Sequence, residues 1–148
     1  MADIDMDESE YEQSTTAKML TEAKTFVINS KNYMTAKEIA KIAGYSGSDP
    51  SSWLNQRVRD KMIFVITHDG VDYFPSYVLD PQNGWKPYAA MAEILAIFNG
   101  EKGGWGCAFW FEAVNGYLGG KAPREILALD PERVIKAAAI EMEYVTHG

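Results

Sequence analysis

The fold expected for the first half of the chain is decided by one segment, residues 34–80, which reads MTAKEIAKIAGYSGSDPSSWLNQRVRDKMIFVITHDGVDYFPSYVLD. Its first helix is marked by Thr35 and Glu38, which have the spacing of a capping box, and by Gly44, the residue type that commonly ends a helix. Its second helix begins at Asp49-Pro50, an N-cap followed by proline at the first helical position. The segment therefore opens with two helices joined by a turn.

A β-hairpin is expected directly after these helices. Residues 63–67 and 71–74 are rich in apolar and β-branched side chains, and Asp69-Gly70 lies in the turn between them. A helical pattern also precedes the segment, over residues 16–29. The resulting order of helix, helix, turn, helix and hairpin predicts a winged helix-turn-helix over residues 14–80.

In such a domain the second helix of the pair enters the major groove of DNA. Amide side chains suit adenine and arginine suits guanine, while serines at a helix start can hold a phosphate and a histidine can form the tip of the wing. The candidate DNA-binding residues are Ser51, Ser52, Asn55, Gln56, Arg57, Arg59 and His68. Asp60 interrupts the few cations, which predicts weak sequence-independent attraction to DNA, and small winged domains also serve as protein-docking units.

The net charge of −7 is concentrated at the N-terminus, because residues 1–13 hold six acidic residues and no basic one. A block of this kind predicts a solvated, disordered tail, and the alternative is a tail that competes with nucleic acid for a basic surface. The single cysteine excludes an internal disulfide. No apolar run approaches the ~20 residues of a membrane span and the N-terminus lacks the pattern of a secretory signal, so we expect a cytoplasmic protein without a membrane partner.

The best domain boundary is the loop at residues 80–84, beyond which residues 86–148 follow a helical period. The glycine-rich residues 99–106 are expected to link two of these helices. Cys107 is expected to be a packed core thiol, since it belongs to an apolar stripe. The stripes expected to face the core are Met91, Ile94, Leu95 and Phe98; Cys107, Trp110, Phe111 and Val114; Ile126, Leu127 and Leu129; and Ile135, Ala138, Ala139 and Met142.

Residues 115–134, NGYLGGKAPREILALDPERV, predict a sharp corner between helices. Gly119-Gly120 permits left-handed backbone and close approach of another element. Pro123 starts a short helix, and Asp130-Pro131 caps and starts the last one. A rigid corner is sufficient to explain this pattern, and a binding corner is the functional interpretation.

The longer segment AFWFEAVNGYLGGKAPREILALDPERVIKAAAIEME, residues 108–143, resembles the toxin-binding domain of the Xre/MbcA/ParS class of antitoxins. Together with the preceding stripe, the resemblance covers residues 86–148. The matching positions are Trp110, Asn115, Leu118, Gly119, Gly120, Pro123, Leu127 and Val134. The resemblance implies a partner-binding set of Trp110, Asn115, Leu118, Gly119, Gly120, Lys121, Pro123 and Arg124. The first half differs from the family, whose DNA-binding domain is a five-helix Xre type.

The expected fold is therefore mainly α with a small β-hairpin: a winged helix-turn-helix followed by a helical toxin-binding domain. The expected function is a non-catalytic, antitoxin-like homodimer that neutralises a toxin of the RES type, an enzyme that destroys NAD, and that binds operator DNA. The alternatives are a stand-alone DNA-binding transcriptional regulator, or a phage- or plasmid-borne adaptor that engages another host protein. No phosphate loop, zinc ligand set or combination of acid, base and nucleophile is present, so we expect neither an enzyme nor a cofactor.

Overall fold

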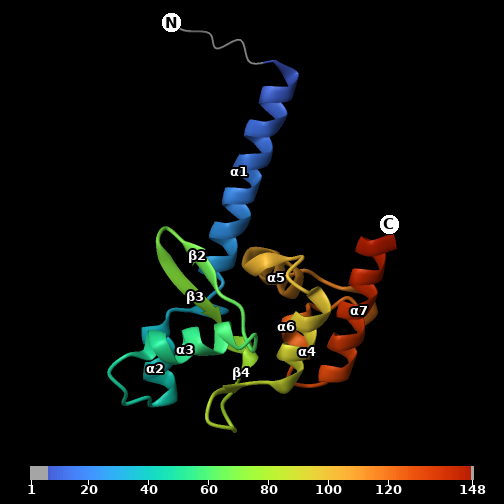
Figure 1. Ribbon diagram of the computed structural model, residues 1–148. Helices are drawn as coiled ribbons and strands as arrows, with labels where there is room; N and C mark the ends of the chain where they lie inside the picture. The colour runs from blue at the N-terminus through green and yellow to red at the C-terminus, as the bar shows by residue number, and fades with distance from the viewer. Residues whose placement is uncertain (1–6, 148) are drawn as a thin grey trace, which may run out of the picture.

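The computed structural model describes residues 7–147, and the chain is mainly helical with small antiparallel sheets (Figure 1). The elements in chain order are α1 (Glu8–Asn29), β1 (Tyr33–Met34), α2 (Ala36–Ala43), α3 (Pro50–Arg59), β2 (Ile66–His68), β3 (Val71–Pro75), η1 (Ser76–Val78), β4 (Leu79–Asp80), β5 (Lys86–Pro87), α4 (Ala89–Phe98), α5 (Gly103–Glu112), η2 (Gly116–Leu118), α6 (Pro123–Ile126) and α7 (Pro131–His147). Strands β1 to β4 lie within residues 33–80 and helices α4 to α7 follow, but the short strand β5 falls within the part that was expected to be helical throughout.

The caps of α2 and α3 are formed as their residue types predict. The Thr35 side chain accepts a hydrogen bond from the Glu38 backbone N–H, and the Glu38 carboxylate accepts one from the Thr35 backbone N–H. Gly44 ends α2 with a φ of 69°. Asp49 caps α3, whose first residue is Pro50. These two helices are set by local side-chain chemistry, since a capped helix start and a left-handed glycine stop need no distant contact.

The hairpin is confirmed but is shorter than expected, because β2 begins at Ile66 rather than at residue 63. His68 pairs with Val71 across a two-residue turn, in which Asp69 and Gly70 have φ angles of 50° and 77°. Positive φ at both turn positions matches the right-handed twist of the strands. The strand β1 was not predicted, and it adds to β3 to give the sheet order β1-β3-β2.

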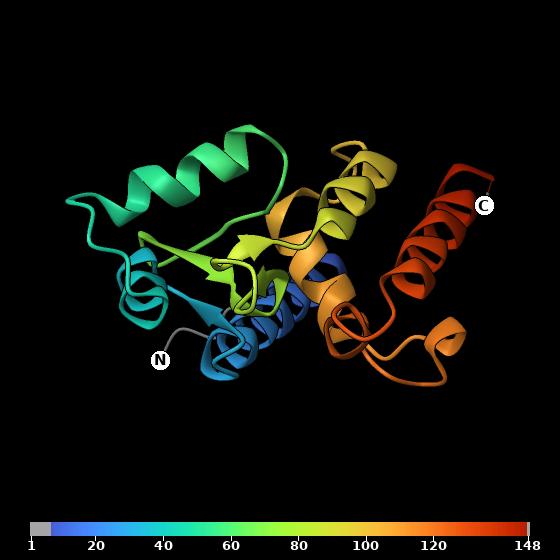
Figure 2. The same cartoon turned by 90° about the horizontal axis from the view of Figure 1, so that it is seen from below.

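The loop at residues 80–84, expected to be a domain boundary, is closed into a tight hairpin by β4 and β5. The residues on both sides of this loop contribute side chains to one continuous hydrophobic core. Phe111 of α5 stacks on Phe64 and packs at 5.5 Å on the ring of Tyr77. Figure 2 shows the resulting arrangement, with α2 and α3 on one side, α4 and α7 on the other, and α5 between them.

The long helix α1 begins at Glu8, earlier than the residue 16 expected from the sequence. Residues 8–13, which were predicted to be part of a disordered tail, are therefore helical, and Asp7 caps the helix through the Glu10 backbone N–H. Residues 1–6 of that predicted tail lie outside the described residues. Figure 1 shows α1 extending away from the rest of the molecule, with Val27 as its buried residue.

Two expectations for the second half are corrected. The glycine-rich stretch expected as a link joins α4 to α5 only over residues 99–102, because α5 already begins at Gly103. Within this helix, Gly104 lies so close to the Val65 carbonyl oxygen that a Cβ there would overlap it. Val114 and Leu129, which were expected to face the core, are 76% and 81% exposed. Within residues 7–147, no helix combines the length and apolar character needed to cross a membrane.

Candidate functional site

The corner between α5 and α6 is built by backbone hydrogen bonds around one asparagine. The Asn115 side chain accepts from the Tyr117 N–H at 2.9 Å, and the Asn115 carbonyl accepts from the Gly120 N–H at 3.0 Å. The Asn115 N–H donates to the Lys121 carbonyl at 3.0 Å, which closes the corner into a loop. Gly119 and Gly120 have φ angles of 68° and 80°, a region that strains other residues, so the glycine pair lets the chain reverse at this point.

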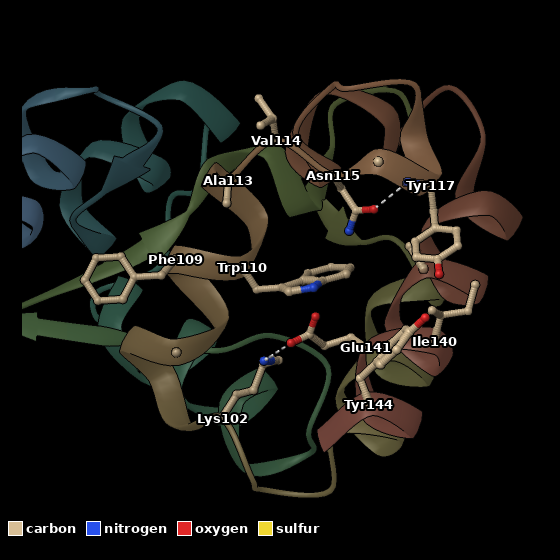
Figure 3. Close-up of a pocket in the computed structure, with 13 residues that line it drawn as sticks. Lys102, Phe109, Trp110, Ala113, Val114, Asn115, Tyr117, Ile140, Glu141 and Tyr144 are labelled. Atoms are coloured by element: carbon tan, nitrogen blue, oxygen red, sulfur yellow. Dashed lines mark hydrogen bonds and ion pairs between the residues drawn. The ribbon is translucent and has the colours of Figure 1, made fainter. Parts of the chain in front are cut away.

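This corner forms one wall of a groove of about 510 Å³ between α5, η2 and α7 (Figure 3). Trp110 and Phe109 come from α5, Tyr117 from η2, and Ile140 and Tyr144 from α7. Trp110 is only 8% exposed and lies along the floor of the groove, where its ring packs edge-on against Phe98 at 5.1 Å. Trp110 and Asn115, two of the residues predicted to bind a partner, thus line the same groove.

The floor of the groove carries an unsatisfied donor. The Trp110 indole Nε1–H is buried and has no hydrogen-bond partner among the described residues. Leaving such a donor unpaired costs about 1–3 kcal/mol. One end of the groove is closed by an ion pair between the Lys102 ammonium and the Glu141 carboxylate at 3.2 Å, with the two side chains 17% and 36% exposed (Figure 3). The ammonium also lies over the ring of Phe98.

The rim of the groove is aromatic and exposed. Tyr117 and Tyr144 are 54% and 68% exposed, and their hydroxyls lie together on the rim in Figure 3. The pKa of the Tyr117 phenol is raised, chiefly by the neighbouring Tyr144 hydroxyl. Val114 adds an exposed apolar side chain at the corner. A rim of this composition is typical of interfaces, where tyrosine combines apolar area with a polar hydroxyl.

Several predicted partner-binding residues are buried or hydrogen-bonded within the chain and so support the corner. Leu118 and Pro123 are buried beneath the corner. Arg124 donates from Nε to the Glu112 carboxylate at 2.9 Å, and Asn32 of the first half donates to the same carboxylate at 3.2 Å. These contacts tie the corner to the strand-containing half of the chain. The exposed members of the predicted set are Gly119, Gly120 and Lys121.

The start of α3, where two serines were predicted to hold a phosphate, carries a carboxylate. Asp49 accepts hydrogen bonds from the Ser52 N–H at 3.1 Å and from the Ser52 hydroxyl at 2.6 Å, and the latter lowers the pKa of Asp49. An ionised carboxylate already occupies the end of the helix that would attract an anion. Ser51 beside it is exposed.

The remaining DNA-binding candidates lie on α3 and the hairpin. The Gln56 side-chain amide donates to the Asp60 carboxylate at 3.1 Å and accepts from the Arg59 guanidinium at 2.8 Å. Gln56 and Arg59, both predicted to contact DNA, are therefore hydrogen-bonded to each other on the surface of α3. Arg57 lies over the ring of Trp53. Asn55 is half-buried in the hollow beside Ser51 and Phe74, and His68 is half-buried, 3.4 Å from the Asp69 carboxylate.

The thiol of Cys107 is buried in the core, as expected, and burial raises its pKa to about 11. A thiol of this kind is a poor nucleophile near neutral pH. Among residues 7–147, no group of three His, Cys, Asp or Glu side chains is placed to hold a metal ion. The lining of the groove combines apolar and aromatic side chains with one ion pair.

Sequence reasoning missed the exposed side of this site. Tyr117 lies within the predicted corner, between Asn115 and the glycine pair, and its large side chain in so tight a turn could have marked it as exposed. Tyr144 and the Lys102–Glu141 pair carry no local signal, because the three residues are brought to one groove only when α7 packs on α4 and η2. No protein-family model, curated protein or solved structure matches the chain.

Proposed function

We propose that the chain is a non-catalytic, antitoxin-like regulator whose C-terminal half binds and blocks a protein toxin. The RES type is the class that the antitoxin resemblance implies. The observation that carries this proposal is the groove between α5, η2 and α7, with its exposed rim of Val114, Tyr117 and Tyr144. Contiguous apolar surface with a polar edge commonly marks a protein-binding site.

The interior of the groove supports a protein segment as the occupant. Apolar and aromatic side chains line it, among them Phe109, Trp110 and Ile140, and a bound protein segment would pack against them. The Lys102–Glu141 ion pair offers both signs of charge at the end of an otherwise apolar groove. Such a pair contributes to orientation and specificity more than to affinity.

The first experiment tests the rim of the groove. We expect the double substitution Tyr117→Ala and Tyr144→Ala to weaken the complex with the protein encoded next to this chain about 30-fold or more, as interface tyrosines often do. Affinity is measured by titration calorimetry, and neutralisation by the cellular NAD level during co-expression. The matched control is Tyr11→Ala, which removes a tyrosine that is 64% exposed on α1 and should leave binding unchanged. Absence of any complex with the wild-type chain would contradict the proposal, as would equal binding by the double variant.

A second candidate function is operator binding, for which we propose that β1 to β3 and the helices α2 and α3 form a winged helix-turn-helix. The sheet order β1-β3-β2 and the two-residue hairpin turn support this proposal. The exposed charges argue for modest affinity, since Asp49 and Asp60 lie at the two ends of α3 and Asp69 and Asp72 lie on the hairpin.

The second experiment is a mobility shift with the DNA upstream of the chain's own gene. We expect Arg57→Ala combined with Arg59→Ala to weaken a specific shift about tenfold or more, because a base-contacting arginine contributes about 1–3 kcal/mol. The control Lys136→Ala removes an exposed cation from α7 and should preserve the shift. If the wild-type chain gives no specific shift at modest salt, operator binding is wrong and the groove remains the functional surface.

A further inference from the structure

The helix α1 exposes a regular apolar stripe to solvent. Thr16, Met19, Ala23 and Phe26 follow one another at spacings of three, four and three residues, which places them on one face of the helix. All four side chains are exposed, with Met19 at 64% and Phe26 at 74%. Val27, the buried residue of the helix, lies to one side of this stripe, so contact with the body leaves the stripe free.

A helix in this position is poorly supported as a monomer. Its 22 residues span about 33 Å, and most of that length stands off the body in Figure 1. Most helices in proteins are stabilised by packing one face against a neighbour, and an isolated helix is marginal in water. The exposed methionine and phenylalanine therefore mark a face that a second helix would stabilise.

The stripe complements itself when two copies run in opposite directions. It alternates small and large residues in the order Thr16, Met19, Ala23 and Phe26. In an antiparallel pair centred near Thr21, each large side chain meets a small one of the other copy: Phe26 faces Thr16, and Met19 faces Ala23. Large against small lets the layers interdigitate, whereas a parallel pair would stack phenylalanine on phenylalanine and alanine on alanine.

The charges of α1 favour the same direction. The N-terminal end carries Asp7, Glu8, Glu10 and Glu12, whereas residues 19–31 carry Lys24 and Lys31 against the single acid Glu22. An antiparallel pair brings the acidic end of each helix toward the basic end of the other. A parallel pair would bring the two acidic ends together, where like charges repel.

We propose that α1 is a homodimerisation helix that packs antiparallel against α1 of a second copy through Thr16, Met19, Ala23 and Phe26. The inference rests on α1 alone and is independent of the groove on the other half of the chain. It assigns a surface to the dimer and leaves the groove between α5, η2 and α7 free for a partner.

The mass of the full-length chain in solution tests the interface. We expect sedimentation equilibrium to give twice the 16.5 kDa chain mass at micromolar concentration. Met19→Glu combined with Phe26→Glu should raise the dimer dissociation constant about 100-fold or more. The matched control, Thr21→Glu combined with Thr25→Glu, adds the same charge on the opposite face of the same helix and should remain dimeric. The circular dichroism spectrum of each variant is compared with that of the wild-type chain to confirm that the variant is folded. A monomeric wild-type chain, or a charged-stripe variant that stays fully dimeric, overturns the proposal.

The direction of the pair is tested by cysteine cross-linking under mild oxidation. A mixture of Thr16→Cys and Phe26→Cys chains should form a disulfide-linked heterodimer, because these positions face one another in the antiparallel register. Each variant alone should not cross-link, because its two cysteines would be about 15 Å apart along the helices. Native Cys107 does not interfere, since it is buried. Efficient cross-linking of either variant with itself would overturn the antiparallel arrangement.

Discussion

Replacing Phe111 with alanine is expected to lower the free energy of unfolding by about 3–5 kcal/mol, the range for removing a buried phenylalanine. Phe111 is 0% exposed and contacts aromatic rings from both halves: Phe64 at 6.0 Å, Tyr77 at 5.5 Å and Trp110 at 5.0 Å. The substitution removes a ring that packs between the two halves and that also supports Trp110 on the floor of the groove. Because domains of this size are commonly stable by about 5–15 kcal/mol, the loss is a large share of the total.

Urea denaturation followed by both circular dichroism and tryptophan fluorescence measures this effect. Since one core runs through both halves, we expect a single transition by both probes in the wild-type chain and in the variant. Val114→Ala is the control, because Val114 is close in sequence but 76% exposed, and its free energy of unfolding should change by less than about 0.5 kcal/mol. Two separate transitions, only one of which moves in Phe111→Ala, would show that residues 14–80 and 86–148 fold independently.

The second large effect is expected at Gly104, where alanine should lower the free energy of unfolding by about 2–3 kcal/mol. A Cβ at this position would overlap the carbonyl oxygen of Val65, a backbone atom that cannot rotate away. The start of α5 would have to move off the hairpin. That movement would also stretch the hydrogen bond from Trp105 Nε1 to the Thr67 carbonyl, which is 3.1 Å long.

Gly116→Ala is the matched control, because a Cβ at Gly116 has open space around it and the residue has no positive φ. Thermal unfolding of both variants should show a lower midpoint for Gly104→Ala and an almost unchanged one for Gly116→Ala. A shift that is equal in both variants would mean that the close approach to Val65 contributes nothing specific to stability.

The local elements of the first half could be predicted because their signals lie within a few residues. The capping box at Thr35, the proline start at Pro50 and the Asp69-Gly70 turn are all observed, since each depends on neighbouring side chains and backbone angles. The strand β1 was missed because two residues carry no recognisable alternation, and Tyr33 and Met34 are extended only through their pairing with β3.

The site was predictable only in part, because local signals mark a turn but do not say which side of it faces solvent. The glycine pair and Asn115 marked the corner correctly, because left-handed backbone requires particular residue types. Which side of the corner faces solvent depended on packing. Helical spacing placed Val114 in the core, yet it follows the end of α5, where the chain has already turned to extended backbone, and it is exposed.

The sequence by itself determined the starts of α2 and α3, the hairpin turn and the corner, because caps, prolines and glycines act over one turn of chain. Only the tertiary structure decided which surfaces remain available. Tyr117, Tyr144 and the Lys102–Glu141 pair come together because α7 packs on α4 and η2, and the Arg124 guanidinium is held against the Glu112 carboxylate. Exposure is a property of the packed chain, since the same side chain is buried or free according to which distant element covers it.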